Sequence, residues 1–295
     1  MDWLMRMNRA LDHIEMNLAN EIVLKDVAQC ACCSSHQFQR MFSFITNVSL
    51  AEYIRRRRLT LAAIELQNSD TKVVDIAVKY GYESPVSFAR AFYALHGVNP
   101  AKAREEGTAL KAYPRLSFLI SIKGAEPVNY RIETKESFEV FGMERIFSLN
   151  GQETPADFWK QSHENGEVER LAAHAGGVPD FLNPHYHQVH SVCSYTATEE
   201  ETFPYMLCAF KKETSTTEGY TVISIPAYTW AIFPSEPFTW DQFDGVMETL
   251  YQRFFTEWLP TAGYEQVNGL EFEITGSKDG RQFAELWFAV RKITN

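Results

Sequence analysis

The sequence lacks several features that define common protein classes. It contains no run of about 18 apolar residues, so no segment is long and apolar enough for a membrane-spanning helix. Residues 1–18 mix charges into an apolar stripe, which is typical of an amphipathic helix rather than of a signal peptide. Five cysteines in 295 residues do not indicate a disulfide framework. We therefore expect a cytoplasmic protein without membrane contact.

Proline and positive charge are scarce, and each is distributed unevenly. All 12 prolines lie at position 85 or later, which favours an all-helical first part and a strand-rich second part. The net charge is −10, but residues 1–104 hold 13 Lys and Arg against 10 Asp and Glu, whereas the remainder holds 15 against 28. The basic first part is able to approach phosphate, and we expect the acidic part to face away from DNA.

One pattern occurs twice between residues 24 and 104. The motif Phe-x-Arg-x-Phe at residues 38–42 recurs at 88–92, and Asp-Val-Ala at 26–28 recurs as Asp-Ile-Ala at 75–77. The offset changes from 49 to 50 because the second turn has one extra residue. Each copy reads as a short helix, a turn and a second helix. This order predicts two helix-turn-helix units, whose second helices enter the DNA major groove.

Three serines mark helix starts within this repeat. Ser34 is followed three residues later by glutamine, Ser84 stands before Pro85, and Ser49 begins a third helix between the two copies. The roughly 20 residues of this connecting helix, at about 1.5 Å each, span about 30 Å. Successive major grooves on one face of B-DNA are separated by roughly 34 Å. A single chain is therefore predicted to read two adjacent grooves.

These segments resemble the DNA-binding domain of the AraC/XylS family of transcription regulators, and within it the MarA, SoxS and Rob type. The matching stretches are SSHQFQRMF, AEYIRRRRL, DIAVKYGYES and FARAFYALHGVNPAKAR. The resemblance covers about the first 105 residues and implies an all-α, homeodomain-like fold with two helix-turn-helix units. Cys32 departs from the glycine usual in the first turn, and Ala103 departs from the aromatic residue usual before Arg104.

The outward faces of the two second helices hold the candidate DNA contacts. The phenylalanines of the repeated motif are expected to pack inward. Gln39 is able to pair with adenine and Arg40 with guanine or phosphate, whereas Val86 offers only an apolar contact. We expect the first copy to set most of the sequence choice; a solvated polar face is the alternative for each helix. The predicted DNA-binding residues are Ser35, His36, Gln39, Arg40, Arg55, Val86, Ser87 and Arg90.

The second half of the chain has the composition of strands and helices in alternation. From Val128 onward, strand-like segments surround two helical segments at about residues 155–173 and 239–258. The order β-α-β-β occurs twice, over about 90 residues each, and predicts an α+β domain with helices on one face of antiparallel sheet. The predicted division is residues 1–106 for the DNA-binding domain, 107–126 for a linker and 127–295 for the second domain.

A second resemblance covers this half. The stretch IPAYTWAIFPSEP, the helix ending FFTEWLPTAGYE, and the closing FEIT and ELWFAV segments resemble the GyrI-like effector-binding domain. That family commonly binds small, often cationic or amphipathic molecules between two halves, against aromatics and a glutamate. Glu273 is matched to this glutamate, although the aromatic usual two residues later is Thr275. Core packing is the alternative for each aromatic. The predicted ligand-binding residues are Glu273, Glu271, Trp159, Tyr228, Trp230, Trp240 and Trp287.

Two clusters have metal-ligand spacing without a complete motif. Cys30, Cys32 and Cys33 lie at the first turn, and His185, His187 and His190 lie together further on. A lone Cys-x-x-Cys has no second pair nearby, and the histidines have no catalytic glutamate arranged around them. We interpret both as structural and expect no cofactor and no metal, while metal binding stays an open alternative.

These patterns predict a sequence-specific DNA-binding transcription regulator whose second domain binds a small effector. By resemblance it is an activator, and RNA polymerase is a further expected partner beside double-stranded promoter DNA. We expect no enzyme, since no Ser-His-Asp, Walker-type or GxGxxG pattern is present. The alternative is a second domain that modifies a small molecule, with Glu273 and a nearby tyrosine in acid-base roles. A pocket that binds a protein partner is a third interpretation.

Overall fold

The computed structural model describes residues 3–118, 127–149, 151–198 and 202–293. The chain divides into two compact units, Met1–Ser121 and Ile122–Asn295. Within the described ranges, no helix has the length and apolar character needed to cross a bilayer. Each unit has its own core and is described by itself.

The first unit is all-helical, and its helices repeat as the sequence predicts. The first helix-turn-helix pairs α2 with α3, and the second pairs α5 with α6. The starts of α2 and α5 are 49 residues apart and those of α3 and α6 are 50 apart, which confirms the predicted offsets. The elements are α1 (Trp3–Met16), α2 (Leu24–Cys30), α3 (Ser35–Thr46), α4 (Leu50–Asn68), α5 (Val73–Lys79), α6 (Pro85–His96) and a 3-10 turn at Lys102–Arg104.

The predicted helix starts are confirmed by their hydrogen bonds. The Ser34 side chain accepts from the backbone N–H of Gln37, and Ser49 accepts from that of Glu52. Ser84 accepts from the N–H of Ser87, with proline at the first helical position. Each serine thus satisfies one of the backbone donors that a helix start leaves without an intrahelical partner. Local sequence alone therefore fixes where α3, α4 and α6 begin.

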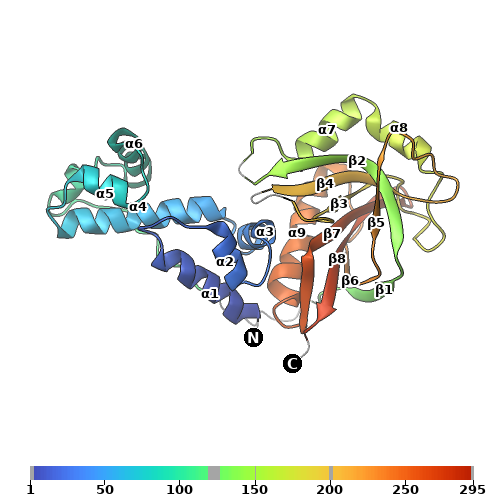
Figure 1. Ribbon diagram of the computed structural model, residues 1–295, viewed down its shortest axis with the longest axis horizontal. Helices are drawn as coiled ribbons and strands as arrows, with labels where there is room; N and C mark the ends of the chain where they lie inside the picture. The colour runs from blue at the N-terminus through green and yellow to red at the C-terminus, as the bar shows by residue number, and fades with distance from the viewer. Residues whose placement is uncertain (1–2, 119–126, 150, 199–201, 294–295) are drawn as a thin grey trace. The chain divides into compact units, whose positions relative to one another are not determined.

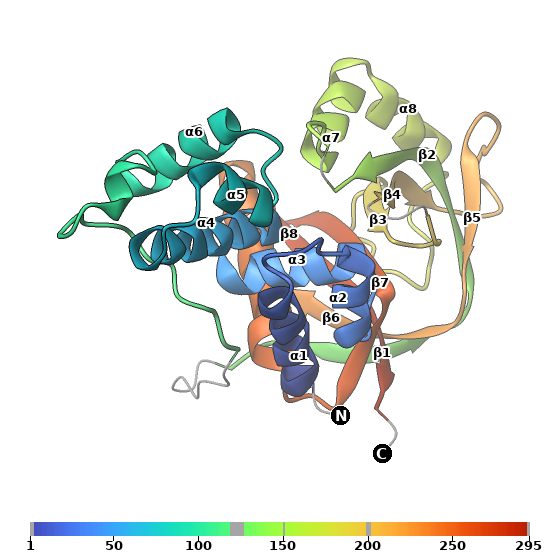
Figure 2. The same cartoon turned by 60° about the vertical axis from the view of Figure 1, so that its left-hand side comes forward.

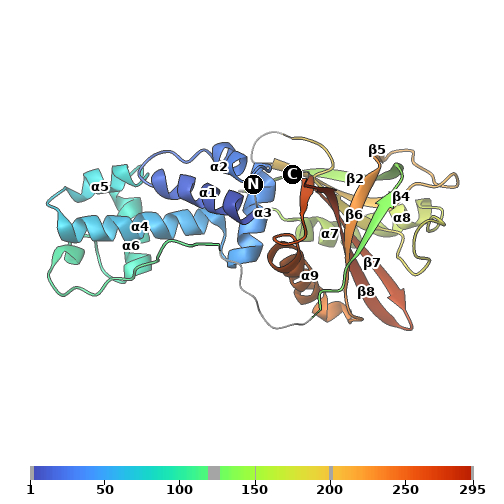
Figure 3. The same cartoon turned by 90° about the horizontal axis from the view of Figure 1, so that it is seen from below.

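The phenylalanines of the repeated motif form the two helix-turn-helix cores, as predicted. Phe38 and Phe42 are buried in the first copy, and Phe88 and Phe92 are buried in the second. In the second copy they pack with small and aliphatic residues of α4 and α5, including Ala77. Figure 3 shows α3 and α6 at opposite ends of α4, with their axes roughly parallel. The 19 residues of α4 span about 28 Å at about 1.5 Å each.

The four consecutive arginines of α4 have different partners, because successive residues point in directions about 100° apart. Arg55 and Arg56 both pair with Glu52, at 2.6 Å each, and the predicted i,i+4 pair with Arg56 is confirmed. Arg57 forms a buried ion pair with Glu15 of α1 at 2.7 Å. Arg58 donates to backbone carbonyls just beyond α1. Two of the four arginines, Arg57 and Arg58, therefore tie α4 to α1 and to the residues that follow it.

The second unit is built on one eight-stranded sheet with helices α7, α8 and α9. Its elements are β1 (Arg131–Lys135), β2 (Phe138–Ser148), α7 (Pro155–Glu164), α8 (Glu167–His174), β3 (His190–Cys193), β4 (Thr202–Phe210), β5 (Thr221–Ile225), β6 (Tyr228–Pro234), a 3-10 turn at Trp240–Gln242, α9 (Phe243–Gln252), a π-helix at Arg253–Trp258, β7 (Tyr264–Lys278) and β8 (Arg281–Lys292). Figure 1 shows how they are arranged within the unit.

The sheet order is β1-β6-β8-β7-β3-β4-β2-β5. It consists of two similar halves whose first strands are exchanged: β1 pairs with β6 of the later half, and β5 pairs with β2 of the earlier half. Figure 2 shows a strongly curved sheet, with β2 and β5 nearly upright and β1 running across its lower part. The predicted duplication is therefore present, but each half borrows an edge strand from the other.

Two details differ from the sequence prediction. Each stretch expected to be one strand before a helix forms two strands, β1 with β2 and β5 with β6. The helix expected over residues 155–173 is two helices, because Gly166 adopts the left-handed conformation (φ 69°) between α7 and α8. The second predicted helix continues from α9 into the π-helix.

Strand pairing assigns the core side chains of the strands to the two faces of the sheet. Directly paired residues lie on the same face, so Tyr205, Cys193, Glu271 and Phe288 share one side. This side packs against α7 and α8 through Phe158 and Leu171, and Tyr251 of α9 reaches it as well. We call it the helix-covered face. The opposite face carries a core rich in aromatic side chains: Phe138, Phe210, Trp230, Phe272 and Trp287.

Candidate functional sites

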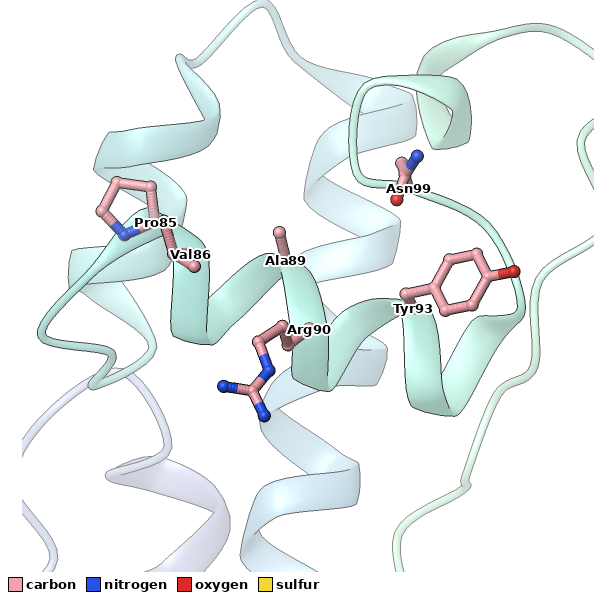
Figure 4. A pocket seen from close by; sticks show the side chains of 6 residues that line it. All are labelled: Pro85, Val86, Ala89, Arg90, Tyr93 and Asn99. Carbon is pink, nitrogen blue, oxygen red and sulfur yellow. The ribbon is translucent and has the colours of Figure 1, made fainter.

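The outward face of α6 forms a shallow groove. Pro85, Val86, Ser87 and Arg90 are exposed, as predicted, while Phe88 on the opposite side is buried. An open cavity of about 650 Å³ runs along this face. Figure 4 shows the side chains that line it: Pro85, Val86, Ala89, Arg90, Tyr93 and Asn99. Sequence reasoning missed Tyr93, which is 56% exposed. Its signal was its spacing, three residues after Arg90 and seven after Val86, which places it on the same face of a helix.

The corresponding helix of the first copy presents a more polar surface. Ser35, Gln39 and Arg40 are partly exposed. The outward position expected for His36 is wrong, since its side chain is buried at 7% exposure and this burial lowers its pKa to about 3. The Arg40 guanidinium lies 5.8 Å from the Phe44 ring centroid, one helical turn further along. In the connecting helix, Arg55 makes hydrogen bonds of 2.6 and 2.8 Å to Glu52. The DNA-contact roles of these residues stay predictions.

The two turns place different residues in the same backbone conformation. Cys32 in the first turn has φ 57° and Gly81 in the second has φ 80°. This left-handed conformation costs an ordinary residue roughly 1–2 kcal/mol but is open to glycine. Gly81 also lies close to Arg58, because an added Cβ would be 2.7 Å from its Nη1. The departure noted at Cys32 therefore puts a non-glycine residue in a strained turn.

The predicted ligand-binding residues lie on both faces of the sheet. Glu271, Glu273 and Trp159 belong to the helix-covered face. Trp230 and Trp287 are fully buried in the opposite core, and Tyr228 packs against it. Trp240 is 54% exposed and stacks on His187. Side chains alternate between faces along a strand, so these residues do not surround one ligand.

The helix-covered face contains a hydrogen-bonded carboxylate cluster. Glu273 accepts hydrogen bonds from Ser191 at 2.7 Å, Tyr205 at 3.0 Å and Tyr251 at 2.9 Å. The Tyr251 hydroxyl also lies 2.9 Å from Glu271. Trp159 donates to the Tyr205 hydroxyl at 2.9 Å, and burial together with the charge of Glu273 raises the pKa of Tyr205. Glu271 and Glu273 share a strand face, as predicted.

The opposite face contains a pocket around Glu285 that the sequence analysis missed. Its volume is about 340 Å³, and we call it the Glu285 pocket. The Glu285 carboxylate, only 6% exposed, accepts from Arg131 at 2.9 and 2.7 Å, from Trp287 Nε1 at 2.9 Å and from the Tyr186 hydroxyl. The lining residues are Arg131, Glu133, Lys135, Phe181, Leu182, Asn183, Tyr186, Glu285 and Trp287.

Backbone pairing holds the loop that carries Tyr186 over this carboxylate. His187 N–H donates to the Thr275 carbonyl at 2.9 Å, and Ser277 N–H donates to the His185 carbonyl at 2.9 Å. Gly276 lies between these bonds, where an added Cβ would come within 2.5 Å of the His185 carbonyl oxygen. Glycine is therefore required for the loop to approach β7, and the approach positions Tyr186.

Two positive and two negative side chains line the Glu285 pocket. Burial acts to lower the pKa of Arg131, but the hydrogen bonds and charge of Glu285 outweigh it and raise that pKa. Burial raises the pKa of Tyr186, and the neighbouring Glu285 charge raises it further. Burial also acts to raise the pKa of Glu133, but the hydrogen bonds from Lys135 and Arg131 lower it overall. The Arg131 guanidinium and the Tyr186 phenol therefore both act as hydrogen-bond donors to Glu285.

A sequence signal for this pocket exists. The GyrI-like resemblance implies a glutamate with an aromatic residue two positions later, and Glu285-Leu286-Trp287 has that spacing. Glu273 has Thr275 at the corresponding position. The closing strand β8 thus carries the expected pair, side by side on one face, whereas the match on β7 is incomplete.

The cysteine and histidine clusters were the two candidate metal sites of the sequence. The five cysteines are free thiols, and burial raises the pKa of Cys33 to about 12. His190 is completely enclosed, which lowers its pKa to about 3, and its Nδ1 accepts from the Thr275 N–H at 3.5 Å. Across the described residues, no group of three or more His, Cys, Asp or Glu side chains has an arrangement that could hold a metal ion.

The fold and its sites define a two-part class of protein. Two helix-turn-helix units present exposed second helices at either end of one connecting helix, and a separate sheet domain contains a charged, aromatic pocket. Such a combination is that of a DNA-binding regulator with a small-molecule-binding domain.

Comparison with known families specifies this class. Residues 131–290 match the model of the integron-associated effector binding protein family, and residues 27–106 match a helix-turn-helix domain. Because the first match spans more than half of the chain, the chain belongs to the integron-associated effector binding protein family. The AraC-type resemblance of the N-terminal part and the GyrI-like resemblance of the C-terminal part are both confirmed.

Curated relatives match about a third of the chain. The HTH-type transcriptional activator AarP of Providencia stuartii is 44% identical over 95 residues, which are 32% of this chain and 70% of AarP. The regulatory protein SoxS of Escherichia coli is 40% identical over 93 residues, 32% of this chain and 83% of SoxS. A solved integron cassette protein from the Vibrio cholerae mobile metagenome is 12% identical over 55% of this chain and 95% of its own, with a TM-score of 0.36. The two family matches and the curated relatives identify the chain as a DNA-binding transcription regulator with an effector-binding domain.

Proposed function

We propose that this regulator reads two successive major-groove segments through α3 and α6 and responds to a small effector held in the Glu285 pocket. The exposed faces of the two helices, joined by the 19-residue α4, support the first part. The name of AarP, a transcriptional activator, supports activation of transcription, and RNA polymerase is the partner that an activator recruits. Gln39 and Arg40 on α3, and Val86, Ser87 and Arg90 on α6, are the proposed DNA contacts.

The effector site depends on one observation above all. Glu285 is a buried carboxylate beside Trp287 and Tyr186, in a pocket of about 340 Å³ within the part of the chain that matches the effector-binding family. Small-molecule sites combine such an aromatic wall with a few placed polar groups. A carboxylate and aromatic faces together favour an effector with a cationic group and an apolar body.

Effector binding is coupled to DNA binding only if the effector prefers one state of the protein. The test is therefore to measure operator affinity by fluorescence anisotropy, with and without compounds found in a thermal-shift screen. Glu285→Gln and Trp287→Leu are expected to abolish the response while DNA affinity without compound is retained. Glu139→Gln, which removes an exposed partner of Lys211, serves as the control and is expected to respond normally. A response that survives both pocket substitutions would place the effector elsewhere.

The Glu273 cluster supports a second candidate function. The Tyr205 and Tyr251 hydroxyls lie 3.0 and 2.9 Å from Glu273, a geometry in which a carboxylate and a phenol are able to exchange a proton with a bound molecule. Turnover of a compound that is lost in Glu273→Gln and retained in Glu285→Gln would favour a modifying enzyme. Saturable binding without turnover would favour the sensor.

A further inference from the structure

The Glu285 pocket contains a closed ring of charged and aromatic contacts. Arg131 bridges Glu285 at 2.7 Å and Glu133 at 2.6 Å, and Lys135 pairs with Glu133 at 2.8 Å. The Lys135 ammonium lies 4.6 Å from the Trp287 ring centroid, and Trp287 donates back to Glu285. The exchanged edge strand β1 supplies three members of this ring, and β8 supplies two.

Lys135 is the unusual member of the ring. Lysine side chains are mostly exposed, yet this one is 13% exposed, although β1 is an edge strand. Its ammonium occupies the face of Trp287 at a distance typical of a bound cation, within about 6 Å of the ring centroid. An aromatic face beside carboxylates is the position that a cationic effector would itself use.

Resting on the proposed effector role of this pocket, we propose that Lys135 is a tethered cation that competes with the effector for the face of Trp287. The ammonium is held on a flexible stem, so it is able to leave the pocket when another cation enters. Tethering gives the lysine a high local concentration, on the order of millimolar or more for short tethers, which an external cation has to overcome. Lys135 thereby sets the threshold concentration of the effector.

The competition has a quantitative consequence. The apparent dissociation constant equals the intrinsic constant divided by the fraction of molecules in which the position is vacant. If the ammonium occupies the position in about 70–97% of molecules, its removal tightens cation binding by about 3- to 30-fold. Removing the lysine charge also leaves Glu133 with Arg131 alone, which favours a cation further.

The test uses the full chain and benzyltrimethylammonium, an aromatic cation, with calorimetry at fixed ionic strength. Lys135→Met removes the charge and keeps most of the stem, and it is expected to bind about 3- to 30-fold more tightly than the unsubstituted chain. Lys135→Arg is expected to bind like the unsubstituted chain. Lys211→Met is the matched control, since Lys211 pairs with Glu139 at 2.7 Å and does not line the pocket.

Each result of this binding comparison either supports or overturns the proposed role of Lys135. Tighter binding in Lys135→Met, with Lys211→Met unchanged, supports the tethered cation. Equal or weaker binding in Lys135→Met overturns it, and the effector pocket itself stands if Glu285→Gln still abolishes that binding. If neither form binds the cation, the tethered cation is overturned, while neutral compounds that lose binding in Glu285→Gln preserve the proposed function. Should Lys135→Met fold poorly by circular dichroism, Lys135→Gln provides the same comparison.

Discussion

The ammonium nitrogen of Lys135 lies 4.6 Å from the Trp287 ring centroid, and the indole of the same tryptophan donates a hydrogen bond to Glu285 at 2.9 Å. One aromatic side chain thus binds a cation on its face and a carboxylate at its edge, as its charge distribution favours. The two partners come from strands separated by β6 in the sheet. This relationship links the exchanged edge strand to the chemistry of the pocket.

Substitution of Gln39 is expected to relax operator discrimination. An amide is able to pair bidentately with adenine, a contact worth about 1–3 kcal/mol against the wrong base. We therefore expect Gln39→Ala to lose discrimination at one position of the operator, measured by competition binding at fixed salt. Arg90→Ala on α6 is expected instead to weaken all sequences about equally and to reduce the salt slope by about 1. Unchanged discrimination in Gln39→Ala would contradict the leading role of α3.

Glycine at position 32 is expected to stabilise the first helix-turn-helix. Cys32 adopts φ 57°, and relief of this strain outweighs the larger entropy of an unfolded glycine by about 0.5–1 kcal/mol. The reverse change, Gly81→Ala, is expected to destabilise, because φ is 80° and the new Cβ would meet Arg58. Urea unfolding with unchanged m-values measures both effects. Destabilisation by Cys32→Gly would show that the thiol makes a compensating contact.

The ion pair between Arg57 and Glu15 is expected to be a major tie between α4 and α1. The two side chains are 11% and 12% exposed, and Arg57 also donates to the Tyr113 carbonyl at 2.6 Å. Removing one partner of a buried pair leaves the other charge uncompensated, at a cost of about 3–5 kcal/mol. Arg57→Ala should therefore shift the urea midpoint strongly. Arg115→Ala, which breaks an exposed pair with Asp12, should change stability by less than about 1 kcal/mol.

Stability of the second unit is expected to depend on the protonation of His190. Its pKa in the folded state is about 3 because of burial, below an ordinary value near 6.5. Between these values the unfolded chain binds more protons, so stability is complete above about pH 6.5 and falls as pH drops toward 3. The slope from this group reaches about 1.4 kcal/mol per pH unit. His190→Leu should reduce the pH dependence of thermal unfolding over that window, whatever its effect at neutral pH.

Much of the first unit follows from local sequence. The offsets of 49 and 50 residues predict that α5 repeats α2 and that α6 repeats α3, because α3 and α6 each carry a serine cap and the same apolar spacing. The inward position of Phe38 and Phe88 follows from the same 3.6-residue period. Helix caps and apolar spacing involve residues only a few positions apart, so they are predictable from one sequence.

The second unit contains features that local sequence patterns do not predict, above all the pairing of its strands. Alternation identifies strands but does not state which strands pair, and the exchange of β1 and β5 between the halves has no signal in either strand. This exchange brings Arg131 and Lys135 to Glu285 and Trp287, more than 150 residues away in sequence. The β7–β8 register, in contrast, places Glu273 on the face opposite to Trp287, because Glu273 pairs with Leu286.

By itself, the sequence determined the duplicated DNA-reading unit, the α+β class of the second domain and the family to which each part belongs. The tertiary structure decided which carboxylate lies in an aromatic pocket and which positively charged side chains lie beside it. The physical reason is that helix caps and apolar periodicity act over a few residues, whereas strand partners are chosen by long-range packing. Arg131 and Lys135 become neighbours of Glu285 and Trp287 only through that choice.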